Sequence, residues 1–386
     1  VKNVLGSPQK GKVTLTVTDY WQRELAREER TVELAELSKA ELKLLNPMLG
    51  KRHSVTVPMF AEEGDELCLA GTLAVSQTTA NKLTAKYERV GGKTVNLSGA
   101  WDRIDLSSGS VTATLSKSGV TLSLELSAAG VLSVTDGAGG CAGSASESVK
   151  SSGGYQSFAG LYSAAFCDPR TREGAGYLTV SVLKSGKATW KGVLADGLSV
   201  GGTSQLSLNP DGSALMPVYR VSSKYSLTAA LRIEPNAVWG HADAPSSVTC
   251  ADGFYARYVA GSRKDAADWL LSVSGGPFEK NIALGQLCKL FGYPTEYELV
   301  IGDVVRETVR AGSTKFALAS KDVITSLAYS SSTGVFSGKA VLPVEAKNVA
   351  GRFCGVVHPG WGEAGVFGTG VFYAKGLALP VAIVSR

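Results

Sequence analysis

Histidine is the side chain best suited to acid–base chemistry or metal binding near neutral pH, because its ordinary pKa lies near 6.5. The sequence has three histidines, His53, His241 and His358, and each stands apart from other His or Cys residues at metal-ligand spacing. The sequence also lacks the motifs of zinc proteases, P-loop proteins and nucleophile elbows. The histidines therefore predict no metal site, no cofactor and no histidine-based catalytic centre.

Acidic residues could form a catalytic pair of the glycosidase type, because the two carboxylates of such a pair can lie far apart in sequence. Asp102 and Asp105 form one group, and Asp265 and Asp268 form another just before Trp269. A solvated loop or the first turn of a helix is the simpler explanation, since acidic residues favour first helical turns. The sequence favours a protein that is not an enzyme, with a glycoside hydrolase or lyase as an alternative.

Tryptophan rings give the clearest indication of ligand binding, because a flat exposed ring can stack on a sugar. Trp190 lies among alternating apolar residues and is expected in a core, where a buried ring removes about 150–250 Å² from water. Trp361 lies in the loop-like segment from His358 to Gly362. We take Trp361, His358 and Trp239 as candidate ligand-binding residues, with a carbohydrate or a surface protein as the partner.

Composition excludes several other classes of partner. The net charge of +5 is spread over 386 residues, and no run of basic residues interleaves with aromatics, so nucleic-acid binding is not expected. No stretch approaches the ~18–20 apolar residues of a membrane span. The 45 glycines and the low charged fraction of 19% indicate strands joined by tight turns.

The beginning of the sequence indicates a processed chain. Val1 stands where an initiator methionine is expected, and no signal peptide follows it. The expectation is a product cut from a longer polypeptide. This makes an accessory part of a larger secreted hydrolase, a peptidase or a glycosidase, the first alternative function.

The cysteines allow a disulfide framework but no zinc ribbon. They are even in number and widely spaced, with no CxxC pair. Sequential pairing would join Cys68 to Cys141, Cys167 to Cys250, and Cys288 to Cys354. The alternative, that several are buried free thiols, stays open.

A repeated phrase predicts how the strands are connected. Residues Gly109–Gly119 line up with Gly176–Gly186 at an offset of 67, with Gly, Thr, Lys, Ser and Gly at matching places. Self-similarity at a fixed spacing indicates a duplicated unit, here a strand that runs into a Lys-Ser-Gly turn. In the first copy, Val120, Leu122 and Leu124 then alternate with polar residues, as in a half-buried antiparallel strand.

By composition, the chain divides into four segments. These are an N-terminal β-rich unit at 1–80, a hairpin module at 81–136, a flexible Gly/Ser linker at 137–154, and C-terminal barrel-like modules at 155–386. In the first segment, Ser38 and Glu41 form a capping box that predicts a short helix ending before Pro47. A second short helix is expected at Arg263–Leu271.

Part of the sequence resembles a known group of modules. The phrase from Gly176 to Ser199, the segment Thr333–Val341 and the glycine-rich stretch Phe353–Tyr373 are similar to repeats near the C-termini of large secreted proteins of the Planctomycetes–Verrucomicrobia–Lentisphaerae bacteria. The resemblance covers about residues 155–375 and, more faintly, 80–136. It implies a β-barrel-like module at the cell exterior and supplies no catalytic residues.

Short strands with regular turn signals predict an all-β fold of tandem antiparallel barrel- or sandwich-like modules with one or two short helices. The function expected from the sequence is a non-catalytic, extracellular or cell-surface structural and binding region.

Overall fold

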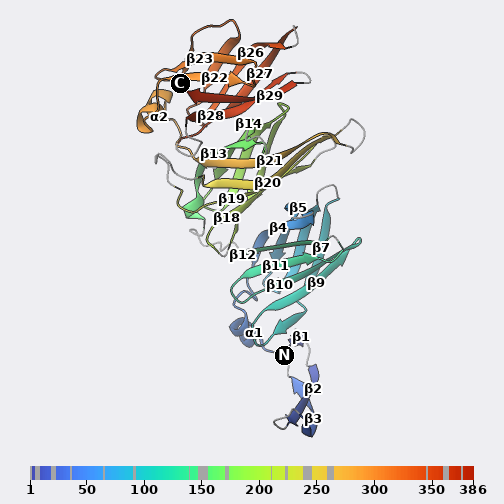
Figure 1. Cartoon of the computed structure of the whole chain (residues 1–386). Helices are drawn as coiled ribbons and strands as arrows, with labels where there is room; N and C mark the ends of the chain where they lie inside the picture. The colour runs from blue at the N-terminus through green and yellow to red at the C-terminus, as the bar shows by residue number, and fades with distance from the viewer. Residues whose placement is uncertain are drawn as a thin grey trace. The chain divides into compact units, whose positions relative to one another are not determined.

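A computed structural model of the chain describes residues 2–4, 9–18, 23–34, 37–63, 66–89, 93–138, 140–146, 155–169, 174–209, 211–221, 225–237, 246–258, 265–344, 347–359, 365–374 and 377–386. The chain forms two compact units, unit 1 (1–61 and 73–147) and unit 2 (62–72 and 148–386). Both are built from antiparallel strands, with two short α-helices in the described part (Figure 1). The expected all-β fold is therefore confirmed.

Unit 1 is an antiparallel β-barrel with one helix and a separate hairpin. Its elements are β1 (Lys2–Val4), β2 (Gln9–Thr18), β3 (Glu24–Leu34), α1 (Lys39–Leu45), β4 (His53–Glu63), β5 (Glu66–Gln77), β6 (Lys82–Arg89), β7 (Val95–Ala100), β8 (Arg103–Asp105), β9 (Val111–Lys117), β10 (Val120–Leu126), β11 (Val131–Asp136) and β12 (Cys141–Ser146). The end of β4 and the beginning of β5 belong to unit 2, which takes residues 62–72. The wall runs in order from β4 to β12, and β12 pairs back onto β4, with Cys141 opposite Ala61. This pairing closes the described strands into a ring, and barrels close in this way to protect the edges of a sheet.

Alternation of apolar and polar residues decides which face of each wall strand points inward. On β10, Val120, Leu122 and Leu124 are buried, whereas Thr121, Ser123 and Glu125 are exposed, as the sequence predicts. On the neighbouring strand β9, the residues opposite Leu122 and Leu124 are Leu115 and Ala113, which are also buried. The barrel interior is therefore filled by side chains from alternate positions.

Helix α1 begins and ends where the sequence predicts. Ser38 accepts a hydrogen bond from the Glu41 amide, and Glu41 accepts one from the Ser38 amide, which completes the capping box. The next residue after the helix, Asn46, is fully buried and donates from its side chain to the carbonyl oxygens of Gly109 and Leu126 at 3.0 and 3.2 Å. These bonds tie the helix end to the barrel wall.

Two of the expected segment boundaries need correction. Residues 80 and 81 lie inside unit 1, because β5 and β6 are neighbours in one barrel wall. The expected linker 137–154 contains the wall strand β12, which pairs with β11 and β4. Its small residues permit a close approach: a Cβ at Gly143 would collide with the Pro58 carbonyl oxygen. A composition typical of flexible linkers here serves tight strand packing.

Unit 2 begins with a second barrel, which we call the central barrel. Its elements are η1 (Gln156–Phe158), β13 (Gly160–Cys167), β14 (Gly174–Val182), β15 (Lys187–Leu194), β16 (Ser199–Gln205), β17 (Ser207–Leu208), β18 (Ala214–Val221), β19 (Tyr225–Ile233), β20 (Val248–Tyr258) and β21 (Asp265–Pro277). The strands follow one another around the wall, and β13 pairs with both β14 and β21, which closes the barrel. Its core is apolar and includes Trp190, which is 1% exposed as expected of a core residue.

A strand occupies the place of the second predicted helix. Residues 265–277 form β21, which pairs with β20 on one side and β13 on the other, so the helix expected at Arg263–Leu271 is wrong. Within the described part of that segment, residues 265–271 pair with β20, and the pairing with β13 follows at Ser272–Pro277. Tertiary pairing outweighs the local pattern that suggested a helix start.

The remainder of unit 2 is an eight-stranded curved sheet, which we call the C-terminal sheet. Its elements are α2 (Leu284–Leu290), β22 (Glu296–Ile301), β23 (Val305–Ala311), β24 (Phe316–Leu318), β25 (Ile324–Tyr329), β26 (Val335–Val344), β27 (Lys347–Val357), β28 (Val366–Ala374) and β29 (Leu377–Ser385). The strand order is β24-β23-β22-β29-β28-β27-β26-β25, so the last strand of the chain lies in the middle. The rings of Phe316 and Tyr329, from the two edge strands, meet edge to face at 6.5 Å. The sheet thus curves round an aromatic core until its edges approach each other.

None of the helices in the described ranges has the length and apolar character needed to cross a bilayer.

Candidate functional site

A pocket of about 580 Å³ lies within unit 2, between the outer faces of the central barrel and the C-terminal sheet. This volume is in the range of pockets that hold small molecules. We call it the junction pocket. Its central-barrel wall consists of Ala165, Cys167, Pro169, Gly174, Ser272 and Ser274. Its C-terminal-sheet wall consists of Val300, Gly302, Asp303, Arg306, His358, Val366, Thr369, Pro380, Val381 and Ala382.

The register of three neighbouring strands builds the barrel-side wall. Cys167 on β13 lies opposite Gly174 of β14 and Ser272 of β21, which places these three residues in one row. Ala165 and Ser274, directly opposite each other, form the next row. Side chains in such rows share a face of the sheet. Residues distant in sequence thereby meet on the outside of the barrel.

A second row builds the opposite wall. Ala382 on β29 lies between Val300 of β22 and Thr369 of β28, and Val300 in turn lies opposite Arg306 of β23. These positions lie outside the aromatic core of the sheet and are only partly covered. The small Ala382 in the middle of the row leaves room between the two walls.

Contacts beside the pocket hold the two walls together. The Ser163 hydroxyl donates to the Thr333 carbonyl oxygen at 2.8 Å, and the Phe278 amide donates to the Leu161 carbonyl oxygen at 2.8 Å. β14 and β28 approach so closely that a Cβ at Gly174 would collide with the Gly370 carbonyl oxygen. The pocket is therefore bounded by packed backbone rather than by long surface side chains.

His358 is the buried polar side chain of the C-terminal-sheet wall. It is 5% exposed, and its Nε2 lies 2.8 Å from the Thr369 hydroxyl oxygen. Its backbone is fixed as well, since its amide donates to Phe367 O and its carbonyl accepts from the Tyr293 hydroxyl. Burial lowers the pKa of His358 to about 3. The imidazole is therefore neutral near pH 7 and is a weak base.

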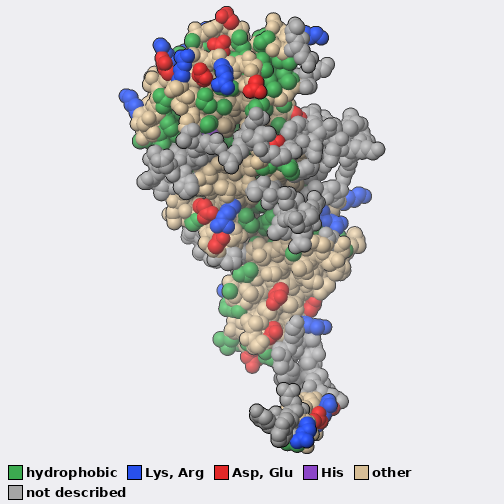
Figure 2. Space-filling view, in the orientation of Figure 1, with side chains coloured by type: hydrophobic (Ala, Val, Ile, Leu, Met, Phe, Trp, Pro, Cys, Tyr) green, Lys and Arg blue, Asp and Glu red, His purple; other side chains and the backbone are tan. Residues whose placement is uncertain are grey.

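The charged residues of the pocket lie at its rim. Asp303 and Arg306 are both exposed, and Arg306 also approaches Glu298 at 3.6 Å. Arg386 reaches the same glutamate at 3.7 Å. Acidic and basic side chains alternate over this face of the C-terminal sheet (Figure 2). Among the described residues, the rim therefore presents charges of both signs.

Hydroxyl groups provide the polar part of the barrel-side wall. Ser272 donates to the Cys167 carbonyl oxygen at 3.2 Å, and Ser274 shares a hydrogen bond with Ser246. Both serines are half-buried. These two serines and Thr369 carry hydroxyl groups, so these interior polar groups of the described lining are uncharged.

The structure places one of the three candidate ligand-binding residues at the pocket. His358 lines it, whereas Trp361 and Trp239 lie outside the described residues. Sequence reasoning missed Thr369 and the serines, and it considered Cys167 only for a disulfide. The one local feature of the sequence that could have pointed to Thr369 is its place between two glycines, in Gly368-Thr369-Gly370.

The expected disulfides are not present among the described cysteines. Cys141, Cys167, Cys250, Cys288 and Cys354 form no disulfide, and the side chain of Cys68 lies outside the described part. The register explains why Cys167 and Cys250 do not pair. Cys167 lies opposite Ser272 and Cys250 opposite Val273, so the two thiols are on opposite faces of the barrel wall.

The other described pairing, Cys288 with Cys354, fails for a similar reason of position. Cys288 lies in α2 with its sulfur 3.5 Å from the Tyr297 hydroxyl, in the core of the C-terminal sheet. Cys354 lies outside that core, packed with Val193 and Val371, where burial raises the pKa of its thiol to about 12. Both sulfurs are buried as small apolar groups.

The described carboxylates considered for catalysis, Asp102 and Asp105, accept hydrogen bonds from nearby protein groups. Asp105 accepts from the Ser107 amide and hydroxyl at 2.8 and 2.6 Å, and these bonds lower its pKa to about 2. Asp102 accepts from the Thr114 amide at 2.9 Å. The side chains of Asp265 and Asp268 lie outside the described part. Among the described residues, no group of three His, Cys, Asp or Glu could hold a metal ion.

Comparisons with known proteins do not assign a family. No family model matches the chain, and no curated protein matches it. A solved structure of a protein of unknown function from the DUF3598 family, from Nostoc punctiforme, aligns with 62% of this chain and 99% of its own at 11% identity and a TM-score of 0.20. Raptor from Chaetomium thermophilum aligns with 91% of this chain and 31% of its own at 8% identity and a TM-score of 0.11.

Proposed function

We propose that this chain is a non-catalytic binding region of a secreted or cell-surface protein, and that the junction pocket holds its ligand. The observation that carries the proposal is a preformed pocket of about 580 Å³ with apolar walls and a few fixed polar groups, which is the usual character of a small-molecule site. The resemblance of residues 155–375 to modules of secreted bacterial proteins supports the location.

The chemistry of the lining favours binding over catalysis. The described lining contains one carboxylate, Asp303, and it is exposed at the rim. His358, with its pKa lowered to about 3, is poorly matched to proton transfer near neutral pH. A glycosidase would need a second convergent carboxylate.

The described lining also favours an apolar ligand over a stacked sugar. It contains no Trp, Tyr or Phe, the residues that form flat platforms for sugar rings. Its apolar surface comes instead from aliphatic residues, among them Ala165, Val300, Val366 and Pro380. Carbohydrate binding would have to rely on residues outside this lining.

The test is binding of an environment-sensitive fluorophore to two matched variants. We expect either neutral N-phenyl-1-naphthylamine or anionic anilinonaphthalene sulfonate to gain fluorescence with the native chain. Ala382→Phe, which fills the middle of the pocket wall, should abolish the gain. Ala378→Phe, an exposed position on the same face of the same strand, should preserve it. Fluorescence that is absent from the native chain, or that survives in Ala382→Phe, would contradict the proposal.

A further inference from the structure

The first property that selects a ligand is the absence of unbalanced charge in the described lining of the junction pocket. Its two charged residues, Asp303 and Arg306, have opposite signs and are exposed to water. Arg306 also forms an ion pair with Glu298. Among the described lining residues, an ionised ligand would therefore leave water without meeting a dedicated counter-charge, which is costly.

The second property is that the buried polar groups are neutral. His358 and the Thr369 hydroxyl lie 2.8 Å apart, and the imidazole is kept uncharged by its burial. A hydroxyl and a neutral imidazole can donate or accept hydrogen bonds according to tautomer and rotamer. They suit a ligand hydroxyl or carbonyl, and they offer little compensation to a carboxylate or an ammonium group.

The third property is the apolar surface between these polar ends. The described lining contributes Ala165 on the barrel side and Val300, Ala382, Val366 and Pro380 on the sheet side. Apolar surface that leaves water contributes about 25 cal/mol per Å². Most of the binding free energy would therefore come from a hydrocarbon portion of the ligand.

We propose that the junction pocket takes a neutral, mainly apolar molecule that carries one hydroxyl or carbonyl group directed to the His358–Thr369 pair. This inference rests on the proposed function, because it specifies the ligand class of the same pocket. It separates the pocket from sites for fatty-acid anions, amines and phosphorylated compounds, which place a fixed opposite charge beside the ionised group.

Competition between matched eight-carbon compounds tests the ligand class. 1-Octanol, octanoate and octylamine share a chain and differ in the charge of one end. We expect 1-octanol to displace N-phenyl-1-naphthylamine from the native chain at about tenfold lower concentration than either ion, since the ions lose hydration and the described lining offers them no dedicated counter-charge. The substitution Thr369→Val should weaken the displacement of the fluorophore by 1-octanol several-fold, and the fluorophore itself should still bind to the variant.

Each outcome separates this inference from the proposed function. Displacement by octanoate or octylamine as effective as that by 1-octanol would overturn the neutral-ligand class. The pocket function would still stand if Ala382→Phe abolished fluorophore binding and Ala378→Phe did not. Binding of the anionic fluorophore but not of the neutral one would also overturn the neutral-ligand class and leave the pocket function standing. Failure of both fluorophores to bind the native chain would overturn both proposals.

Discussion

At the scale of single residues, His358 makes the stability of unit 2 depend on pH. Its pKa is about 3 in the folded protein and near 6.5 when exposed. Between these values, the unfolded chain binds a proton that the folded chain does not. Folding stability therefore falls as the pH falls through this interval, by up to about 1.4 kcal/mol per pH unit.

Replacement of this residue should remove that dependence. A glutamine side chain does not titrate and can still bond to Thr369, so the variant His358→Gln should show a flatter curve of Tm against pH between pH 7 and pH 4. The measurement is thermal unfolding of both proteins across that range. Parallel curves for the two proteins would show that protonation of His358 is not linked to unfolding.

At the scale of elements, the two copies of the repeated phrase form hairpins with different turns. In the first copy, Ser118 and Gly119 have φ of 53° and 78° and lie between the paired residues Lys117 and Val120, as in a two-residue type I′ turn. In the second copy, the Leu183 amide bonds to Lys187 O and encloses three residues that end in a left-handed glycine. Similar sequence thus specifies the hairpin but not the turn.

Two glycines of these turns allow a matched test of steric cost. Gly119 and Gly186 have nearly equal φ, 78° and 76°, but a Cβ at Gly119 meets nothing within 4 Å, whereas one at Gly186 lies 2.6 Å from the Tyr155 ring. We expect Gly119→Ala to destabilise its unit by about 1–2 kcal/mol, the cost of left-handed backbone. Gly186→Ala should cost about 1–3 kcal/mol more, because the buried ring is anchored by a bond to Leu206 O. Chemical denaturation of each unit measures both values, and equal losses would contradict the steric argument.

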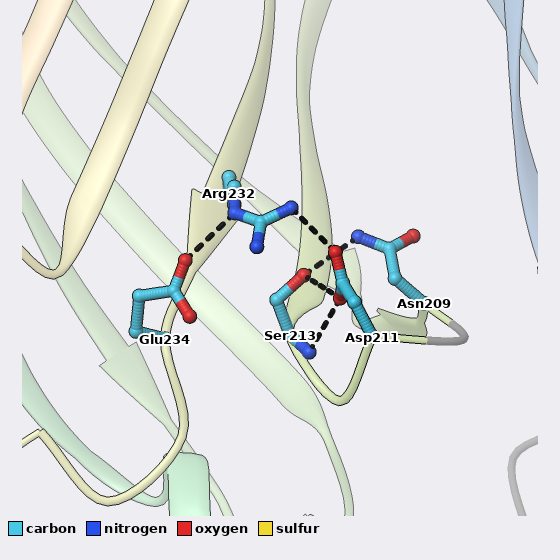
Figure 3. Close-up of polar contacts among 5 residues, drawn as sticks. All are labelled: Asn209, Asp211, Ser213, Arg232 and Glu234. Carbon is cyan, nitrogen blue, oxygen red and sulfur yellow. Dashed lines mark hydrogen bonds and ion pairs between the residues drawn. The ribbon is translucent and has the colours of Figure 1, made fainter.

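The turn between β17 and β18 is fixed by a polar cluster around Asp211 (Figure 3). Asp211 accepts from the Ser213 amide and hydroxyl at 2.9 and 2.7 Å and from Arg232 of β19 at 2.9 Å, while Arg232 also donates to Glu234 at 2.7 Å. The bonds from Ser213, reinforced by Arg232, lower the pKa of Asp211 to about 2. The cluster therefore joins a turn to the strand that follows β18 in the chain.

Acid titration tests the stabilising role of this cluster. A carboxyl whose pKa is lowered by folding stabilises the protein above its ordinary pKa near 4, and this contribution is lost as the pH falls towards 2. The variant Asp211→Asn should therefore have a lower Tm than the native chain at pH 6. The Tm difference between the two proteins should become smaller as the pH falls from 4 to 2. Glu125→Gln, which removes one exposed carboxylate from β10, controls for the change in net charge. A Tm difference that stays constant down to pH 2 would exclude a contribution from ionised Asp211.

Elements with strong local signals were predictable from the sequence, and those defined by distant partners were not. The capping box at Ser38 and the alternation on β10 are complete within a few residues, and both are found as expected. β12 has small residues because it packs closely against Pro58, which no local pattern reveals. β21 is a strand because β13 and β20 pair with it from both sides.

At the scale of the whole molecule, the same distinction explains why one pocket residue was predicted and most were not. His358 is chemically distinctive in the sequence. Cys167 and Ser272 are neighbours only through strand register, and Ala382 lies beside Thr369 only because the last strand of the chain enters the middle of the C-terminal sheet. Closure of two sheets against each other creates the site, so its residues carry no shared sequence signal.

The same packing predicts that the central barrel and the C-terminal sheet unfold as one body. Tyr177 projects from β14 and packs in two small apolar clusters, one with Ala165 and Val356 and the other with Cys354 and Val371. Tyr177→Ala should cost about 2 kcal/mol, since the ring is only partly buried. If the two sheets are coupled, amide hydrogen exchange should accelerate in β27 and β28 as well as in β14. Thr179→Ala, on the same face of β14, should change exchange much less. Acceleration confined to β14 would mean that the barrel and the sheet open independently, and the walls of the pocket would then separate without unfolding.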